Sequence, residues 1–77
     1  MKKIKEIERG GLTGSLYLEK LGYTYKIKGR INGKMTTLGR SYVYLSRKER
    51  ALELMENEID SILDITTLFN MNEYRKD

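Results

Sequence analysis

The sequence contains no cysteine and no histidine, and these absences remove much of the chemistry that small proteins use. Without cysteine the chain can form neither a disulfide framework nor a thiolate metal site. Without histidine it lacks the commonest metal ligand and the commonest catalytic base. No clustered acid and base stands out among the remaining residues. We therefore expect no enzyme, no catalytic residue, no metal site and no cofactor.

Long apolar runs are also missing, since no stretch approaches the roughly 20 residues that span a bilayer. The segment from Met1 to Glu8 lacks the hydrophobic block of a signal peptide. A chain of 77 residues makes one small domain with a thin core. We expect a cytoplasmic protein without membrane contact.

Positive charge is concentrated in the first part of the chain. Residues 1–46 hold ten Lys or Arg against three Glu, whereas residues 47–77 hold five against eight acidic residues. The modest net charge of +4 therefore conceals a cationic part and an acidic part. This asymmetry indicates that one surface meets a polyanion. Ordinary solvated surface charge is the alternative interpretation.

The segment from Tyr23 to Ile31 alternates apolar and polar residues, as in a strand with one buried face. Its polar positions are Thr24, Lys26, Lys28 and Arg30. Three cations on one pleated face repel one another, and an anionic partner would relieve that cost. Nucleic acid is the first candidate.

Two further strands flank this segment, at residues 15–20 and at residues 34–38. Asn32-Gly33 is a strong signal for a two-residue hairpin turn. That turn predicts the pairs Ile31 with Lys34, Arg30 with Met35, Gly29 with Thr36, Lys28 with Thr37 and Ile27 with Leu38. A two-residue first turn would also place Leu18 opposite Tyr25 and Leu16 opposite Ile27.

An amphipathic helix follows the strands. Ser46-Arg47-Lys48-Glu49 has the form of a capping box. Apolar residues then recur at helical spacing, at Leu52, Met55, Ile59, Ile62 and Leu63. A small sheet with one apolar face needs a cover, and this helix provides it. The sequence thus predicts an α+β fold of order β-β-β-α, a three-stranded antiparallel sheet packed on one face by a carboxyl-terminal amphipathic helix.

Three segments are predicted. Residues 1–13 form a basic flexible arm, residues 14–63 the β-β-β-α domain, and residues 64–77 an apolar extension. Asn70-Met71-Asn72 interrupts the helical pattern, so a short second helix, a dimer contact or a linker are all open for the extension. The homodimer contact would use Ile65, Leu68, Phe69 and Met71.

The open face of the predicted sheet suits double-stranded DNA, because strands can seat side chains in the major groove. Arg30 is the best candidate to read a guanine, and Met35 or Thr37 the best to touch a thymine methyl. Lys34 and Arg40 suit phosphates. The candidate DNA-binding residues are Tyr17, Thr24, Lys26, Lys28, Arg30, Lys34, Met35, Thr37 and Arg40.

Four short stretches resemble the amino-terminal arm-type DNA-binding domain of phage-type tyrosine recombinases. They are Ser15-Leu16-Tyr17-Leu18, Gly22-Tyr23-Thr24-Tyr25, Gly33-Lys34 and Leu38-Gly39-Arg40, within a region spanning residues 14–62. The resemblance implies an AP2-like sheet domain that binds arm sites in DNA, in an integrase-like or accessory recombination or regulatory role. It also implies a bacterial or phage-infected cell. The catalytic residues of that family belong to a domain with no counterpart in this chain, so no strand cleavage is expected.

Glu19 departs from a purely basic face, and we expect it to pair with Lys26 or to accept from a cytosine amino group. Tyr42 and Tyr44 either close the sheet edge against the helix or lie exposed. Two alternative functions use the same cations. One is a small phage or mobile-element protein that binds and inhibits a host protein through its acidic surface, and the other is an oligomer that sequesters an anionic nucleotide. Salt dependence and a preference for duplex would separate them from DNA binding.

Overall fold

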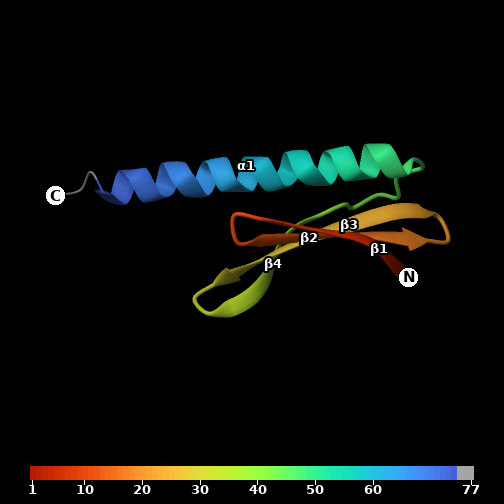
Figure 1. Ribbon diagram of the computed structural model, residues 1–77, viewed down its shortest axis with the longest axis horizontal. Coiled ribbons are helices and arrows are strands. Elements are labelled where there is room, and N and C mark those ends of the chain that lie inside the picture. Colours follow the sequence, from red (N-terminus) through yellow and green to blue (C-terminus); the bar gives the residue numbers. More distant parts are fainter. Residues whose placement is uncertain (75–77) are drawn as a thin grey trace.

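The computed structural model has the element order β1 (Lys2–Arg9), β2 (Leu12–Glu19), β3 (Gly22–Ile31), β4 (Lys34–Arg40) and α1 (Lys48–Tyr74). It describes the backbone of residues 1–74 and the side chains of residues 1–65. The strands form one antiparallel sheet in the order β1-β2-β3-β4, and α1 lies along one face of it (Figure 1). The predicted α+β class and the single covering helix are confirmed. The predicted number of strands is wrong, because the sheet has four.

The additional strand comes from the segment predicted to be a flexible arm. β1 pairs with β2 through a turn at Gly10-Gly11, whose φ angles of 58° and 83° suit a tight hairpin. Ile4 and Ile7 both pack against the core although an odd spacing puts residues on opposite faces of a regular strand. A bulge between Lys3 and Lys5 resolves the conflict, and it hides the alternation that would have identified the strand.

The β2–β3 hairpin turns one residue earlier than predicted. Lys20 and Leu21 form the turn, so Leu16 pairs with Tyr25, and Leu18 pairs with Tyr23. The predicted partner of each β2 residue therefore lies two residues away from the observed one in β3. Each side chain nevertheless stays on its predicted face, because the displacement changes the partner's number by two.

The β3–β4 hairpin follows the prediction up to its middle. Asn32 and Gly33 form the turn with φ angles of 52° and 82°. All four predicted pairs from Ile31–Lys34 back to Lys28–Thr37 are found. A bulge then intervenes, and Ile27 pairs with Gly39 where Leu38 was expected.

The chain after β4 returns along the start of β3 before it enters α1. Leu45 and Tyr23 exchange two backbone hydrogen bonds, of 2.8 and 2.9 Å. α1 begins at Lys48, where the Ala51 N–H donates to the Arg47 carbonyl over 3.0 Å. This start lies within the predicted capping box.

The predicted boundary placed the end of the helix near residue 63, but α1 continues beyond it. Its backbone continues through Asn70-Met71-Asn72 to Tyr74, so the extension begins as more of the same helix and not as a second one. Asparagine is a weak helix former, but it lowers helix stability by only about 0.5 kcal/mol per residue relative to alanine. The neighbouring helical turns can offset this cost. The predicted dimer residues Leu68, Phe69 and Met71 lie outside the described side chains. No helix in the described part of the chain is long and apolar enough to cross a membrane.

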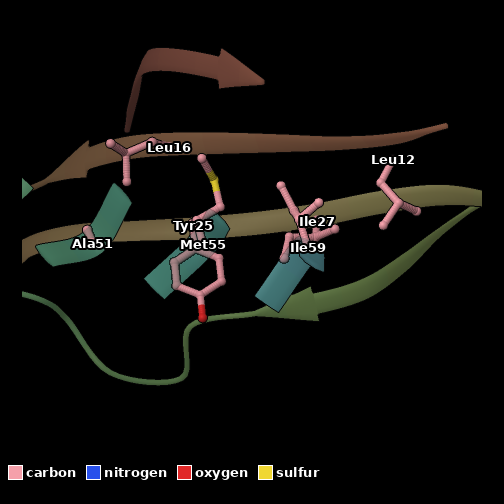
Figure 2. Packing of buried hydrophobic residues seen from close by; sticks show 7 residues of the cluster. All are labelled: Leu12, Leu16, Tyr25, Ile27, Ala51, Met55 and Ile59. Atoms are coloured by element: carbon pink, nitrogen blue, oxygen red, sulfur yellow. The ribbon is translucent and has the colours of Figure 1, made fainter. Parts of the chain in front are cut away.

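The core lies between α1 and the two central strands (Figure 2). It consists of Leu12, Leu16, Tyr25, Ile27, Ala51, Met55 and Ile59. Gly14 lets the helix approach β2, since a Cβ there would lie 2.8 Å from the Ile59 Cδ1 atom. Five of these residues have no exposed surface: Leu16, Ile27, Ala51, Met55 and Ile59. Because the core and α1 lie on one face of the sheet, the opposite face is not covered by the helix.

Candidate nucleic-acid interface

The cations of β3 lie on the sheet face that α1 leaves uncovered. Tyr25 and Ile27 are buried against the helix, so the alternate positions Lys26 and Lys28 point the other way. Arg30 continues this row and is exposed, as is Lys28, whereas Lys26 is half-buried. The predicted sorting of β3 into an apolar and a cationic face is therefore found.

Neighbouring strands bring most of the other predicted residues to the same face, because directly paired residues share a face. The pairs are Tyr17 with Thr24, Lys26 with Arg40, Lys28 with Thr37 and Arg30 with Met35. Lys34 pairs with Ile31, two positions beyond the helix-facing Gly29, and so lies on the opposite face of the hairpin. Eight of the nine predicted residues thus share one face.

The outer part of the β3–β4 hairpin projects as a two-stranded ribbon. Figure 1 shows its tip bending away from α1, and every residue from Arg30 to Thr37 is exposed. Apolar side chains at this tip are uncovered too, with Ile31 47% and Met35 57% exposed. Both faces and both edges of residues 30–37 are therefore accessible to a partner, whereas Gly29 is buried and Lys28 also pairs with Thr13 of β2. We refer to residues 28–37 as the ribbon, with Lys28 and Gly29 at its base.

Charge on this hairpin is of one sign. No acidic residue occurs between Glu19 and Glu49 in the sequence. None of the five cations of β3 and β4 forms an ion pair with a described carboxylate; they are Lys26, Lys28, Arg30, Lys34 and Arg40. No ion pair within the described part of the molecule relieves their mutual repulsion.

Three cations elsewhere, Lys3, Arg9 and Arg50, form ion pairs. Arg9 on β1 donates to Asp60 over 2.8 Å and to Glu56 over 3.3 Å, which ties the first hairpin to the helix. The hydrogen bonds and charge of Asp60, and the charge of Glu56, raise the pKa of Arg9. Arg50 donates to Glu53 over 3.0 Å. Glu53, Glu56 and Asp60 of α1 thus take part in ion pairs, and the described residues contain no cluster able to hold a metal ion.

The other half of the open face is not basic, which corrects the expectation of a uniformly cationic surface. Glu6 and Glu8 of β1 pair with Ser15 and Thr13 and so lie on this face. The Lys3 ammonium donates to Glu6 over 2.9 Å. This hydrogen bond and the charge of Lys3 lower the pKa of Glu6. The prediction missed these acids because it assigned them to a mobile arm.

Glu19 and the two open tyrosines are also placed by the structure. Glu19 accepts a hydrogen bond of 2.8 Å from the Thr24 hydroxyl, so the predicted ion pair with Lys26 is wrong. Tyr42 is 84% exposed and Tyr44 48% exposed, so neither closes the sheet against the helix. The Arg40 guanidinium carbon lies 5.0 Å from the centre of the Tyr42 ring.

Comparisons with known proteins add no family to this geometry. No protein-family model matches the chain. Searches of the curated proteins and of the solved structures give no match either. The functional interpretation therefore depends on the surface itself.

Proposed function

We propose that the protein is a non-catalytic double-stranded DNA-binding module whose β3–β4 ribbon enters the major groove. One observation carries the proposal: a projecting two-stranded ribbon bears cations without described carboxylate partners. The major groove is wide enough for such a ribbon, and phosphates supply the missing negative charge.

Each side chain of the ribbon has a role that follows from its place. Arg30 and Met35 are the pair nearest the turn on the open face, so they reach deepest on that face and meet base edges. Lys28 and Thr37 form the next pair on the same face, two pairs farther from the turn. Lys34 lies on the other face of the hairpin, where it meets a phosphate on the groove wall. The proposal thereby assigns sequence reading to the tip and anchoring to its sides.

The acidic residues of β1 decide how the duplex sits. Glu6 and Glu8 would face phosphates if DNA lay across the middle of the sheet, and that arrangement is unfavourable. The duplex therefore lies over β3 and β4. This differs from the recognition mode expected from the sequence, in which the whole sheet face occupied the groove.

An integrase-like, accessory recombination or regulatory role in the cytoplasm of a bacterial or phage-infected cell is part of the proposal and rests on the sequence resemblance alone. A homodimer through the distal part of α1 stays a prediction. Ile65, the one predicted dimer residue with a described side chain, is 68% exposed. A dimer would present two ribbons and could recognise two half-sites.

The first test is selection from a random pool of duplex DNA at two salt concentrations. We compare the wild type with a Lys26/Lys28/Arg30 triple alanine variant whose fold is checked by circular dichroism. A second triple alanine variant at Lys5, Lys20 and Lys48 removes the same charge from exposed positions elsewhere. Enrichment of one short motif by the wild type and this control, but not by the first variant, supports the proposal.

Single substitutions separate base reading from phosphate anchoring. Arg30→Ala should cost roughly 1–3 kcal/mol of binding free energy and relax sequence preference. Lys34→Ala should weaken all duplexes alike and reduce the salt slope by about one unit. Equal losses on every sequence would reject base reading by Arg30. A folded wild type without salt-sensitive duplex binding would reject DNA altogether and favour an acidic host protein or a nucleotide.

A further inference from the structure

An exposed aromatic loop lies beside the basic face, between β4 and α1. The Ser41 N–H donates to the Tyr25 carbonyl over 3.1 Å, and the Tyr25 N–H donates to the Ser41 hydroxyl over 3.0 Å. Four residues later, Leu45 is bonded to Tyr23. Tyr42 lies between these two attachments. The loop is therefore held to β3 at both ends, and the ring of Tyr42 is presented to solvent from a fixed base.

A cleft of about 390 Å³ separates this loop from the open face of the sheet. Its walls combine four kinds of group. Lys26 and Arg40 supply positive charge, Tyr42 an aromatic face, Thr24 a hydroxyl and Glu19 a carboxylate. A duplex phosphate would use the cations but would gain nothing from the ring and would be repelled by the carboxylate.

The cleft residues have bonding capacity to spare. Neither Lys26 nor Arg40 forms an ion pair with a described carboxylate. Glu19 accepts one hydrogen bond, from Thr24, although a carboxylate has about four acceptor sites. These groups match three features of a nucleotide. The flat base can stack on the ring, the phosphate can meet the cations, and an exocyclic amino group of the base can donate to the carboxylate.

We propose that this cleft binds an unpaired nucleotide that adjoins the bound duplex, at an end, nick or junction. The inference rests on the proposed DNA-binding function, because Lys26 and Arg40 belong both to the cleft and to the paired row behind the ribbon. One continuous nucleic acid can thus contact both sites. An acidic peptide is disfavoured by Glu19.

The chemistry of the cleft also specifies the base. Guanine, cytosine and adenine carry an amino group that can donate to Glu19, whereas thymine offers only carbonyl oxygens and one ring N–H. A guanine presents both its ring N–H and its amino group to a carboxylate. We therefore expect an unpaired guanine to bind more tightly than an unpaired thymine.

The test measures binding of labelled short duplexes by fluorescence anisotropy. A one-nucleotide guanine overhang should tighten binding by the wild type about five- to tenfold over the blunt duplex, the lower part of the range for base stacking on an aromatic ring. Tyr42→Ala should abolish this gain and Tyr42→Phe should keep it. Leu21→Ala, which removes another exposed side chain outside the cleft, should also keep it. A 2-aminopurine overhang should lose fluorescence only with a ring at position 42.

Glu19→Gln should narrow the difference between guanine and thymine overhangs without weakening the blunt duplex. Equal binding of blunt and overhanging duplexes by the wild type would overturn the inference and leave the proposed function standing. Failure to bind any duplex would instead overturn the proposed function and the inference with it. Displacement of the overhang by guanosine monophosphate at equal concentration would overturn the assignment to a nucleotide of the bound duplex.

Discussion

Tyr25 provides a pH-dependent test of how the helix is joined to the sheet. Its ring is part of the core and only 7% exposed, and its hydroxyl donates a hydrogen bond of 2.7 Å to Glu58 of α1. Burial raises the pKa of Tyr25 from 10.0 to about 12, with further contributions from this hydrogen bond and from the negative charge of Glu58. The folded protein therefore holds the phenol neutral at pH values where the unfolded chain ionises it.

The sign and size of the effect follow from this difference. Because the folded pKa is the higher one, the stabilising contribution is complete below pH 10 and is lost as the pH rises towards 12. One pKa unit corresponds to about 1.36 kcal/mol. The free energy of unfolding should fall by about 1.4 kcal/mol near pH 11 and by at most about 2.7 kcal/mol above pH 12 from this group alone.

The measurement is urea-induced unfolding at about pH 8 and about pH 11, for the wild type and for Tyr25→Phe. Phenylalanine cannot ionise, and the two proteins share every other ionisable group. The wild type should therefore lose more stability between the two pH values than the variant does. Glu58→Gln should show an intermediate loss, because it removes the charge but keeps an acceptor. Parallel losses in the wild type and Tyr25→Phe would refute the reasoning.

Two substitutions test the packing of α1 on the sheet. Met55→Ala should lower the free energy of unfolding by about 2–5 kcal/mol because the side chain has no exposed surface, whereas Leu21→Ala, at a position 73% exposed, should change it by less than about 0.5 kcal/mol; comparable losses in urea unfolding would contradict the core described above. Gly39→Ala should cost about 1 kcal/mol, since its Cβ would push the flexible Glu58 carboxylate away and break its hydrogen bond with the Tyr25 hydroxyl. Its effect should be smaller in a Tyr25→Phe background, and strict additivity would show that the two sites are not coupled.

Alternation along the chain was enough to predict which face each residue of β3 occupies. The strand follows period two without exception: Tyr25 and Ile27 are buried, and the cations Lys26 and Lys28 alternate with them. Even the wrong partners predicted for β2 left the faces right, since the ladder was displaced by a full period. Where a strand is regular, sequence pattern and structure agree.

Two of the failures coincide with bulges. The bulge near Ile4 disguised β1 as an arm, and the bulge before Lys28 changed the partner of Ile27. A bulge adds one residue to a strand and so breaks the period on which the prediction depends. Gly10-Gly11 was the available signal for the missed hairpin, because adjacent glycines tolerate the positive φ angles of such a turn.

The candidate site was predicted in its residues but not in its limits. Eight of the nine residues share a face, yet the acids beside them were not placed there, and the position of Tyr42 was left open between the sheet edge and solvent. Both depend on chain segments, β1 and the loop after β4, whose paths are set by contacts with distant residues. Local pattern carries no information about such contacts.

The strict alternation of β3 limits how this surface can change in related proteins. Substitution of Lys26 or Lys28 alters the outer face and leaves Ile27 in the core. Insertion or deletion of one residue within β3 would exchange the two faces from that point onward, placing cations against α1 and apolar groups in water. Related proteins should therefore acquire new binding preferences by point substitution in β3. Differences in length should occur at the Asn32-Gly33 turn.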